Sequence, residues 1–184
     1  MFATLLLVII AALLVWAAAD YNLLVRDRNR VGQAWSDVDV QLTRRHDLVP
    51  RLVELVKGYA SYERALLENV AALRSRGLAA TSPAQRGEVE RSLGSGVHRL
   101  VALAESYPDL KASENFLDLQ HKLVDTENQI QFARRYYNGA VNAFNTRIDQ
   151  FPDLMIARAF AFRPAEFFDL DDPKVAEAPR VGVS

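Results

Sequence analysis

Residues 113–150 read SENFLDLQHKLVDTENQIQFARRYYNGAVNAFNTRIDQ and carry the longest uninterrupted helical pattern in the chain. Inward-facing positions recur at alternating intervals of three and four residues, which is the a/d spacing of packed helices. They are Phe116, Leu119, Leu123, Thr126, Ile130, Ala133, Tyr137, Ala140, Phe144 and Ile148. As a helix the segment would be about 57 Å long. Because a helix buries such a seam only against other helices, the pattern predicts an all-α bundle.

A second helical series precedes it and crosses a proline. Its apolar positions are Val31, Trp35, Val38, Leu42, Val49, Leu52, Val56, Ala60, Leu66, Val70 and Leu73. Pro50 lies in no polar loop, so it either kinks one long helix or occupies the first turn of a new one. The sequence leaves both readings open.

The segment from Gly77 to Gly96 holds four of the eight glycines and predicts the main loop with a weakly specified helix start. A shorter helix then runs to about Ser106, with Leu93, Val97, Leu100 and Leu103 facing inward. No stretch shows sustained alternation with a period of two, so strands are not expected. Residues 21–170 are thus predicted to form an elongated antiparallel helical bundle of four segments.

Residues 1–20 are predicted to be a transmembrane anchor. Eighteen of the first nineteen residues are apolar, and Thr4 is the exception. A helix over residues 2–19 reaches about 27 Å, close to the ~30 Å of a bilayer core. A cleaved signal peptide is one alternative, because Ala17-Ala18-Ala19 resembles a cleavage site, although only Met1 stands where a basic region would be. A buried core helix is the other alternative.

The charges beside this segment predict its orientation. Arg26, Arg28 and Arg30 follow it closely, so the positive-inside rule places the C-terminal domain in the cytoplasm and the N-terminus outside the inner (plasma) membrane. Trp16 and Tyr21 fit an aromatic belt at that interface, or Tyr21 packs within the bundle.

The end of the chain is aromatic and then acidic. Phenylalanines surround Pro164 and are expected to dock on the bundle: Phe160, Phe162, Phe167 and Phe168. Together with Asp169, Asp171 and Asp172 they form, alternatively, a short motif that binds a partner. Residues 171–184 are expected to be a flexible tail.

Composition excludes several classes of protein. A net charge of −1 argues against nucleic-acid binding, which usually requires a basic excess. The absence of cysteine excludes disulfides, thiolate metal sites and cysteine nucleophiles.

The best candidate for a metal site is the pair Asp118 and His121, with Glu114 and Asp125 on the same side of the helix. A di-iron bundle needs a second acid-x-x-His element, but the other histidines, His46 and His98, follow Thr43 and Ser95 at that spacing. The acid/His stripe also lies off the apolar seam. A solvated charged face is therefore expected, with no metal ligand among these residues.

The charged run Arg44, Arg45, His46 and Asp47 is a candidate acid/base or anion site. The favoured interpretation is an exposed surface. Pairing of the two arginines with acidic groups elsewhere in the bundle is the second interpretation, and a lipid headgroup contact is the third.

Other polar patterns predict structure rather than chemistry. Asp37 and Asp39 lie on different helical faces and do not converge. Asn138, Asn142 and Asn145 form one stripe, for which an internal contact is favoured over a partner-docking face. The glycines at 94 and 96 lack the strand, third glycine and lysine of a phosphate loop. The sequence thus predicts no enzyme, no catalytic residue and no cofactor.

Blocks spread over most of residues 21–170 carry a family resemblance through their joint spacing. They include Tyr21-Asn22, Arg28-Asn29, AWSDVDVQL (34–42), Asp47-Leu48-Val49-Pro50, Val56-Lys57-Gly58-Tyr59-Ala60, YPDLKA (107–112), Thr126-Glu127-Asn128, Tyr136-Tyr137-Asn138 and Phe151-Pro152. Together they resemble the LemA family. The resemblance implies a bacterial membrane-anchored helical bundle without an agreed activity, with some relatives associated with membrane proteases and one branch with magnetosome membranes.

The sequence therefore predicts a single-pass membrane protein that acts as an interaction scaffold or adaptor, for example for a membrane protease or another membrane complex. The alternative is a self-associating or lipid-binding protein that organises the membrane. The expected partners are the lipid bilayer and other membrane proteins or further copies of the chain. No nucleic acid or small-molecule substrate is expected.

Overall fold

The computed structural model describes residues 1–60 and 62–168, and this part of the chain forms helices without a strand. The helices are α1 (Phe2–Tyr59), α2 (Arg64–Ala79), α3 (Pro83–Glu105), α4 (Pro108–Lys111), α5 (Glu114–Asp149) and α6 (Asp153–Ala159). The prediction of an all-α fold is confirmed. The predicted flexible tail, residues 171–184, lies outside the described residues.

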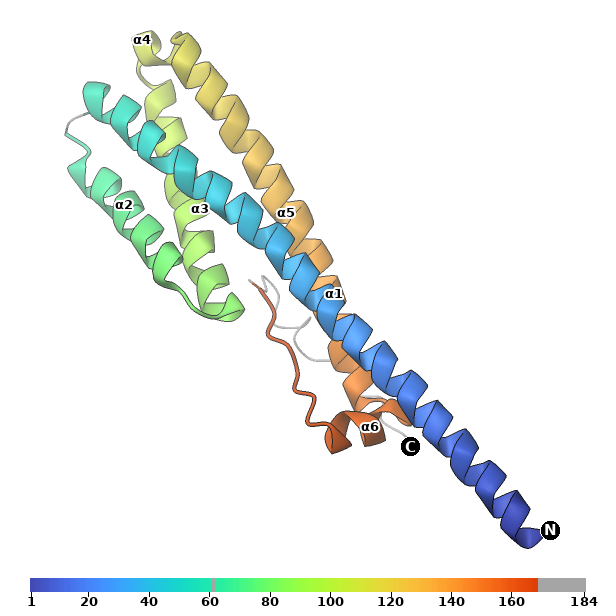
Figure 1. Ribbon diagram of the computed structural model, residues 1–184. Helices are drawn as coiled ribbons and strands as arrows, with labels where there is room; N and C mark the ends of the chain where they lie inside the picture. Colours follow the sequence, from blue (N-terminus) through green and yellow to red (C-terminus); the bar gives the residue numbers. More distant parts are fainter. Residues whose placement is uncertain (61, 169–184) are drawn as a thin grey trace, which may run out of the picture.

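The bundle is elongated and built around α1 (Figure 1). Helix α5 runs antiparallel to α1 along most of its bundle portion, while α2 and α3 form a hairpin beside the second half of α1. The four-segment antiparallel arrangement is thus the one that the apolar periodicity predicted. The N-terminal part of α1 projects beyond the bundle, and its apolar segment is exposed along its length. The alternative of a buried core helix for residues 2–19 is wrong.

Helix α1 passes through Pro50 without a break, which settles the choice that the sequence left open. Proline has no N–H, so the carbonyl of His46, four residues earlier, loses its helical donor. Arg74 of α2 replaces that donor, with Nε at 2.7 Å from the His46 carbonyl oxygen. The neighbouring helix therefore satisfies the carbonyl that the proline leaves unpaired, and α1 stays continuous.

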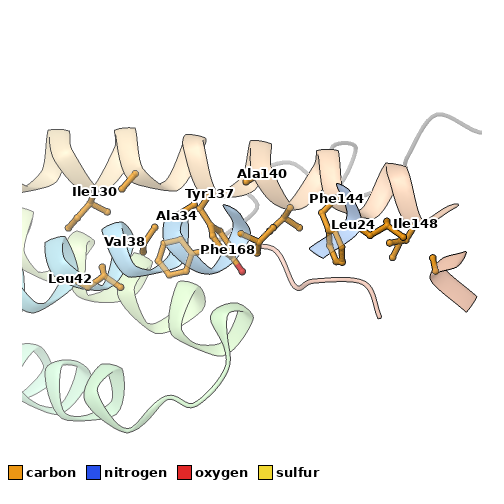
Figure 2. Close-up of a cluster of buried hydrophobic side chains, with 14 of the residues drawn as sticks. Leu24, Ala34, Val38, Leu42, Ile130, Tyr137, Ala140, Phe144, Ile148 and Phe168 are labelled. Carbon is orange, nitrogen blue, oxygen red and sulfur yellow. The ribbon is translucent and has the colours of Figure 1, made fainter. Parts of the chain in front are cut away.

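Two apolar clusters fill the bundle, one at each end. Figure 2 shows the first, where Leu24, Ala34, Val38 and Leu42 of α1 face the second half of α5. The second cluster lies between the other half of α1, the α2–α3 hairpin, α4 and the start of α5. All ten seam positions predicted on α5 are buried, and Val141 joins them.

The segment Gly77–Gly96 does hold a loop and a helix start, as predicted, but the loop is short and most of the segment is helical. Helix α2 continues to Ala79 and α3 begins at Pro83, so only residues 80–82 connect them. Ser82 caps α3 by accepting from the Gln85 backbone N–H at 3.3 Å, and Pro83 suits the first helical turn.

Two of the glycines in this segment, Gly77 and Gly96, serve close packing rather than chain flexibility. A Cβ at Gly77 would lie 2.5 Å from Glu90 Oε1, and one at Gly96 would lie 2.8 Å from Val70 Cγ2. The loss of helix propensity is about 1 kcal/mol per glycine, which tertiary packing overrides here. The inward-facing set of α3 also differs slightly from the prediction, because Ala104 is buried where Leu103 is only half-buried.

The aromatic segment after α6 docks on the bundle as predicted. Phe168 is buried in the first apolar cluster, and Phe162 and Phe167 pack against it. The Phe160 ring stays largely exposed but stacks on Tyr21 at a centroid distance of 4.7 Å. Tyr21 is 36% exposed and its ring contacts Phe160 and Phe162, so it packs at the edge of the bundle, while its role in an aromatic belt stays a prediction.

Candidate functional site

Four charged or titratable side chains meet between the two apolar clusters. Arg45 and His46 come from α1, Glu90 from α3 and Glu127 from α5. Arg45, His46 and Glu90 are at most 3% exposed, and Glu127 is half-buried. We call these four side chains the charged junction, because they separate the two apolar clusters.

Arg45 is the centre of the charged junction. Its Nε and Nη2 atoms donate to the two carboxylate oxygens of Glu127 at 2.8 and 2.6 Å, which is a bidentate pair. Its Nη1 atom donates to the Glu90 backbone carbonyl at 2.9 Å and to Glu90 Oε2 at 3.0 Å. One guanidinium thus ties α1 to both α3 and α5, and its rigid fork allows little sliding between them.

His46 completes the Glu90 side of the junction. Its Nε2 atom lies 2.5 Å from Glu90 Oε1, so both oxygens of that carboxylate are engaged. Within the described residues, His46 Nδ1 is buried without a hydrogen-bond partner. Gly77 lies directly over this pair, where a Cβ would meet both the carboxylate and the imidazole.

A pocket of about 190 Å³ opens beside the junction. Its walls come from α1, α3, α5 and the docked segment: Arg45, Glu90, Arg91, Gly94, Ser95, His98, Glu127, Ile130, Gln131, Arg134 and Phe168. His46 does not line the pocket, so the imidazole is shielded from it. The junction therefore presents ion-paired carboxylates to the pocket, and the imidazole that lines the pocket is that of the exposed His98.

Two asparagines of the stripe on α5 hold the segment after α6, whose Phe168 forms one wall of the pocket. The side-chain amide of Asn138 exchanges two hydrogen bonds with the backbone of Phe168, at 2.8 and 2.9 Å. Asn145 does the same with Ala165 at 2.9 and 2.8 Å. Asn142 is exposed. For Asn138 and Asn145 the favoured prediction of an internal contact is confirmed.

Tyr137 supports the same segment from beside Asn138. Its hydroxyl donates to the Glu166 backbone carbonyl at 2.7 Å, and its ring stacks on Trp35 with centroids 5.3 Å apart. Burial, followed by the nearby Glu166 carboxylate, raises the pKa of Tyr137 to about 12. The hydroxyl thus stays protonated as a donor through the neutral range.

The favoured interpretation of the charged run in α1 is wrong for two of its residues. Arg45 and His46 are buried instead of exposed, and pairing with acidic groups elsewhere, the second reading, describes Arg45. Arg44 does remain exposed, with a loose 3.9 Å contact to Asp125. Asp47 is also exposed.

The other candidate residues lie apart from the junction. Asp118, His121, Glu114 and Asp125 are all exposed on α5, and Asp118 pairs with Lys122 at 2.6 Å. Asp37 is exposed, whereas the half-exposed Asp39 pairs with Arg86 at 2.7 Å. Over residues 1–60 and 62–168 no group of three or more acidic or histidine side chains is placed to hold a metal ion.

Sequence reasoning missed Glu90 and Glu127, although a signal was present. Helical steps of three and four from Leu42 reach Arg45 and His46 before they reach Val49, so the apolar series of α1 has a charged gap at a buried position. Glu90 likewise stands three residues before Leu93 on the buried face of α3. Two interrupted seams in facing helices are the pattern expected of a buried ion pair.

The fold and the junction define a class: an antiparallel helical bundle, locked by buried charges, whose first helix begins with a segment long and apolar enough to cross a membrane. A model of the LemA family matches residues 34–182, which is most of the chain. The protein belongs to the LemA family.

Three curated proteins illustrate its similarities. Magnetosome protein MamQ 2 of Paramagnetospirillum magneticum is 24% identical over 174 residues, covering 80% of this chain and 64% of that protein. Protein LemA of Metamycoplasma hominis is 29% identical over 134 residues, covering 71% and 60%. Magnetosome protein MamQ of Magnetospirillum gryphiswaldense is 23% identical over 159 residues, covering 72% and 58%. The chain thus spans less than two thirds of these relatives, and none of their names states a reaction.

We predict that the charged junction is a major source of stability. Arg45→Met removes the cation, so the half-buried Glu127 loses its bidentate partner and the buried Glu90 keeps only His46 as a side-chain partner; the free energy of unfolding should fall by about 3–5 kcal/mol. Urea denaturation of the full chain in detergent, followed by the fluorescence of its two tryptophans, Trp16 and Trp35, and by circular dichroism, measures the loss.

Arg44→Met is the matched control for this prediction. It removes a neighbouring arginine of the same helix whose ion pair is exposed, so it should cost less than about 1 kcal/mol. Equal stability of the Arg45→Met and Arg44→Met variants would show that the junction does not hold the helices together.

Proposed function

We propose that this protein is a single-pass membrane protein whose bundle serves as an interaction scaffold for another membrane protein or membrane complex. The observation that carries the proposal is the continuity of α1, which joins the apolar segment to the bundle core in one helix of 58 residues. A bundle connected in this way is held at a fixed height above the bilayer. A bundle held at a fixed height is better placed to bind other membrane proteins at that height than to bind freely diffusing substrates.

The proposal includes a cytoplasmic bundle at the inner (plasma) membrane. Its support is the arginines that follow the apolar segment, since Arg26, Arg28 and Arg30 are all exposed just past the proposed span.

Protease treatment of sealed inverted membrane vesicles tests this orientation. The reagent reaches the cytoplasmic face, so it should digest the bundle while leaving the N-terminal segment protected. A bundle that stays intact until detergent is added would reverse the orientation.

A binding role rather than a catalytic one fits the chemistry of the junction. Its carboxylates are paired with Arg45, and its imidazole does not reach the pocket. The chain has no cysteine, and the names of the family and of the relatives compared state no activity. We therefore infer that the protein is not an enzyme.

The surface proposed for the scaffold role lies on α5. Leu117, Val124 and Phe132 are between 45% and 65% exposed, and they follow one another at intervals of seven and eight residues, or two helical turns each. We call these three residues the outer stripe. They lie on the side of α5 opposite to the buried seam, so packing within the bundle does not account for them.

Self-association is the second candidate function, and the same stripe supports it. Two copies anchored by their N-terminal segments in one bilayer would stand parallel, with their outer stripes at the same height. A two-fold contact of this kind needs the same surface patch on both copies, and a straight stripe on one helix supplies it. The magnetosome relatives do not distinguish between the two candidates by name.

A photo-crosslinker at Phe132 tests both candidates. Benzoylphenylalanine is incorporated at position 132 or, as a control, at Leu78, an exposed apolar residue of α2 outside the stripe. After irradiation of native membranes, a product specific to position 132 that contains another protein supports the scaffold. A product of twice the chain mass supports self-association. If position 132 reacts no more than position 78, the outer stripe is not an interface and both candidates lose their support.

A further inference from the structure

A second group of exposed apolar side chains lies at the other end of the bundle, around α6. Phe151 is 80% exposed, and Met155 and Phe160 are each 59% exposed. We call these three residues the α6 patch. Three large apolar side chains exposed within ten residues of chain are unusual on a surface that faces only water.

The patch lies at the level where α1 leaves its apolar segment. The Phe160 ring stacks on Tyr21, two residues after that segment ends. Ala17, inside the segment, packs against the apolar cluster that contains Ile156 and Ala157 of α6. Figure 1 shows α6 at the end of the bundle from which the N-terminal part of α1 projects.

The two sides of α6 differ in what they contact. Ile156 and Ala157 are buried against the bundle, while Met155 lies on the side of the helix turned away from them. Arg158 and Arg163 are exposed next to the patch in sequence. Apolar and aromatic side chains beside arginines, at the end of a membrane-crossing helix, have the composition of a segment in the bilayer interface.

We propose that the α6 patch inserts into the headgroup and upper acyl region of the bilayer, with Arg158 and Arg163 beside anionic lipid headgroups. The proposal rests on the membrane anchoring of residues 2–19 and adds a second contact with the same bilayer. The two contacts, α1 and the patch, lie on different elements that pack together. They hold the bundle at one tilt, which a single helix crossing the membrane does not do alone.

Lipid quenching of a fluorescent label tests the insertion. Because the chain has no cysteine, Met155→Cys creates a single labelling site for the environment-sensitive dye NBD. The matched control is Phe132→Cys, an exposed apolar position on α5. It lies about 26 Å along the helix from Asp149, the end of α5 next to α6. The full chain is reconstituted into vesicles of phosphatidylcholine and phosphatidylglycerol that carry spin-labelled lipids quenching near the headgroups.

We expect the label at position 155 to be quenched several-fold more strongly than the label at position 132. Adding Phe151→Ser and Phe160→Ser to the Met155→Cys variant should reduce that quenching several-fold. Both serines replace exposed side chains, so unchanged circular dichroism should show that the bundle is still folded.

Three results would overturn the proposal: equal quenching at positions 155 and 132, quenching unaffected by the two serines, or a shielded label at 155 that lipids do not quench. The last would mean that protein covers the patch.

Extraction of the vesicles with alkaline carbonate separates a failure of the α6 patch from a failure of anchoring. Protein that stays in the membrane with an unquenched label contradicts only the patch, whereas protein that washes off contradicts the anchor.

Discussion

The bidentate ion pair between Arg45 and Glu127, extended by Glu90, is the interaction on which the rest of the bundle depends. It lies between the two apolar clusters, where Arg45 and Glu90 are almost fully buried and water would compensate an unpaired charge on either of them poorly. Burying one guanidinium therefore requires carboxylates from two other helices at matching heights. This requirement fixes the register of α1, α3 and α5, which apolar side chains alone would specify less strictly.

The consequences extend to the helices around the junction. Gly77 has no side chain because Glu90 and His46 occupy the space that a Cβ would need. Arg74 donates to the His46 carbonyl, and so keeps α1 continuous past Pro50. The residues around the junction thus position α2 against α1 and pack closely around the buried imidazole of His46. They also keep the central helix continuous. In the proposed arrangement, the length of that helix would place the outer stripe of α5 far from the bilayer and the α6 patch next to the bilayer.

The parts of the fold that follow from apolar periodicity were predictable residue by residue. The seam of α5 from Phe116 to Ile148 is buried as expected, because its spacing leaves one helical face to pack. Asn138 and Asn145 were also interpreted correctly as internal, since their stripe runs beside that seam.

The errors have a common physical cause. Arg45 and His46 were assigned to the surface from their chemical type, but position on the helical face, not type, decides burial once partners exist on other helices. Glu90 and Glu127 come from elements 45 and 82 residues away from Arg45, so no local pattern pairs them. Backbone freedom predicts a loop at Gly77 and Gly96, although the role of these two glycines is steric and depends on which side chains the neighbouring helix presents. Pro50 was undecided because its carbonyl partner, Arg74, belongs to α2.

The central claim is that one rigid helix connects the bilayer to the bundle. Double electron–electron resonance between two spin labels tests this claim most directly, because it measures the distance between them. The labels are attached at Leu14→Cys and Ser36→Cys, exposed positions on the two sides of the expected membrane boundary. With the full chain in lipid nanodiscs, 22 residues of continuous helix predict a narrow distance distribution centred at about 33 Å. A broad distribution, or one centred at a clearly shorter distance, would show a hinge between membrane and bundle and would contradict the account.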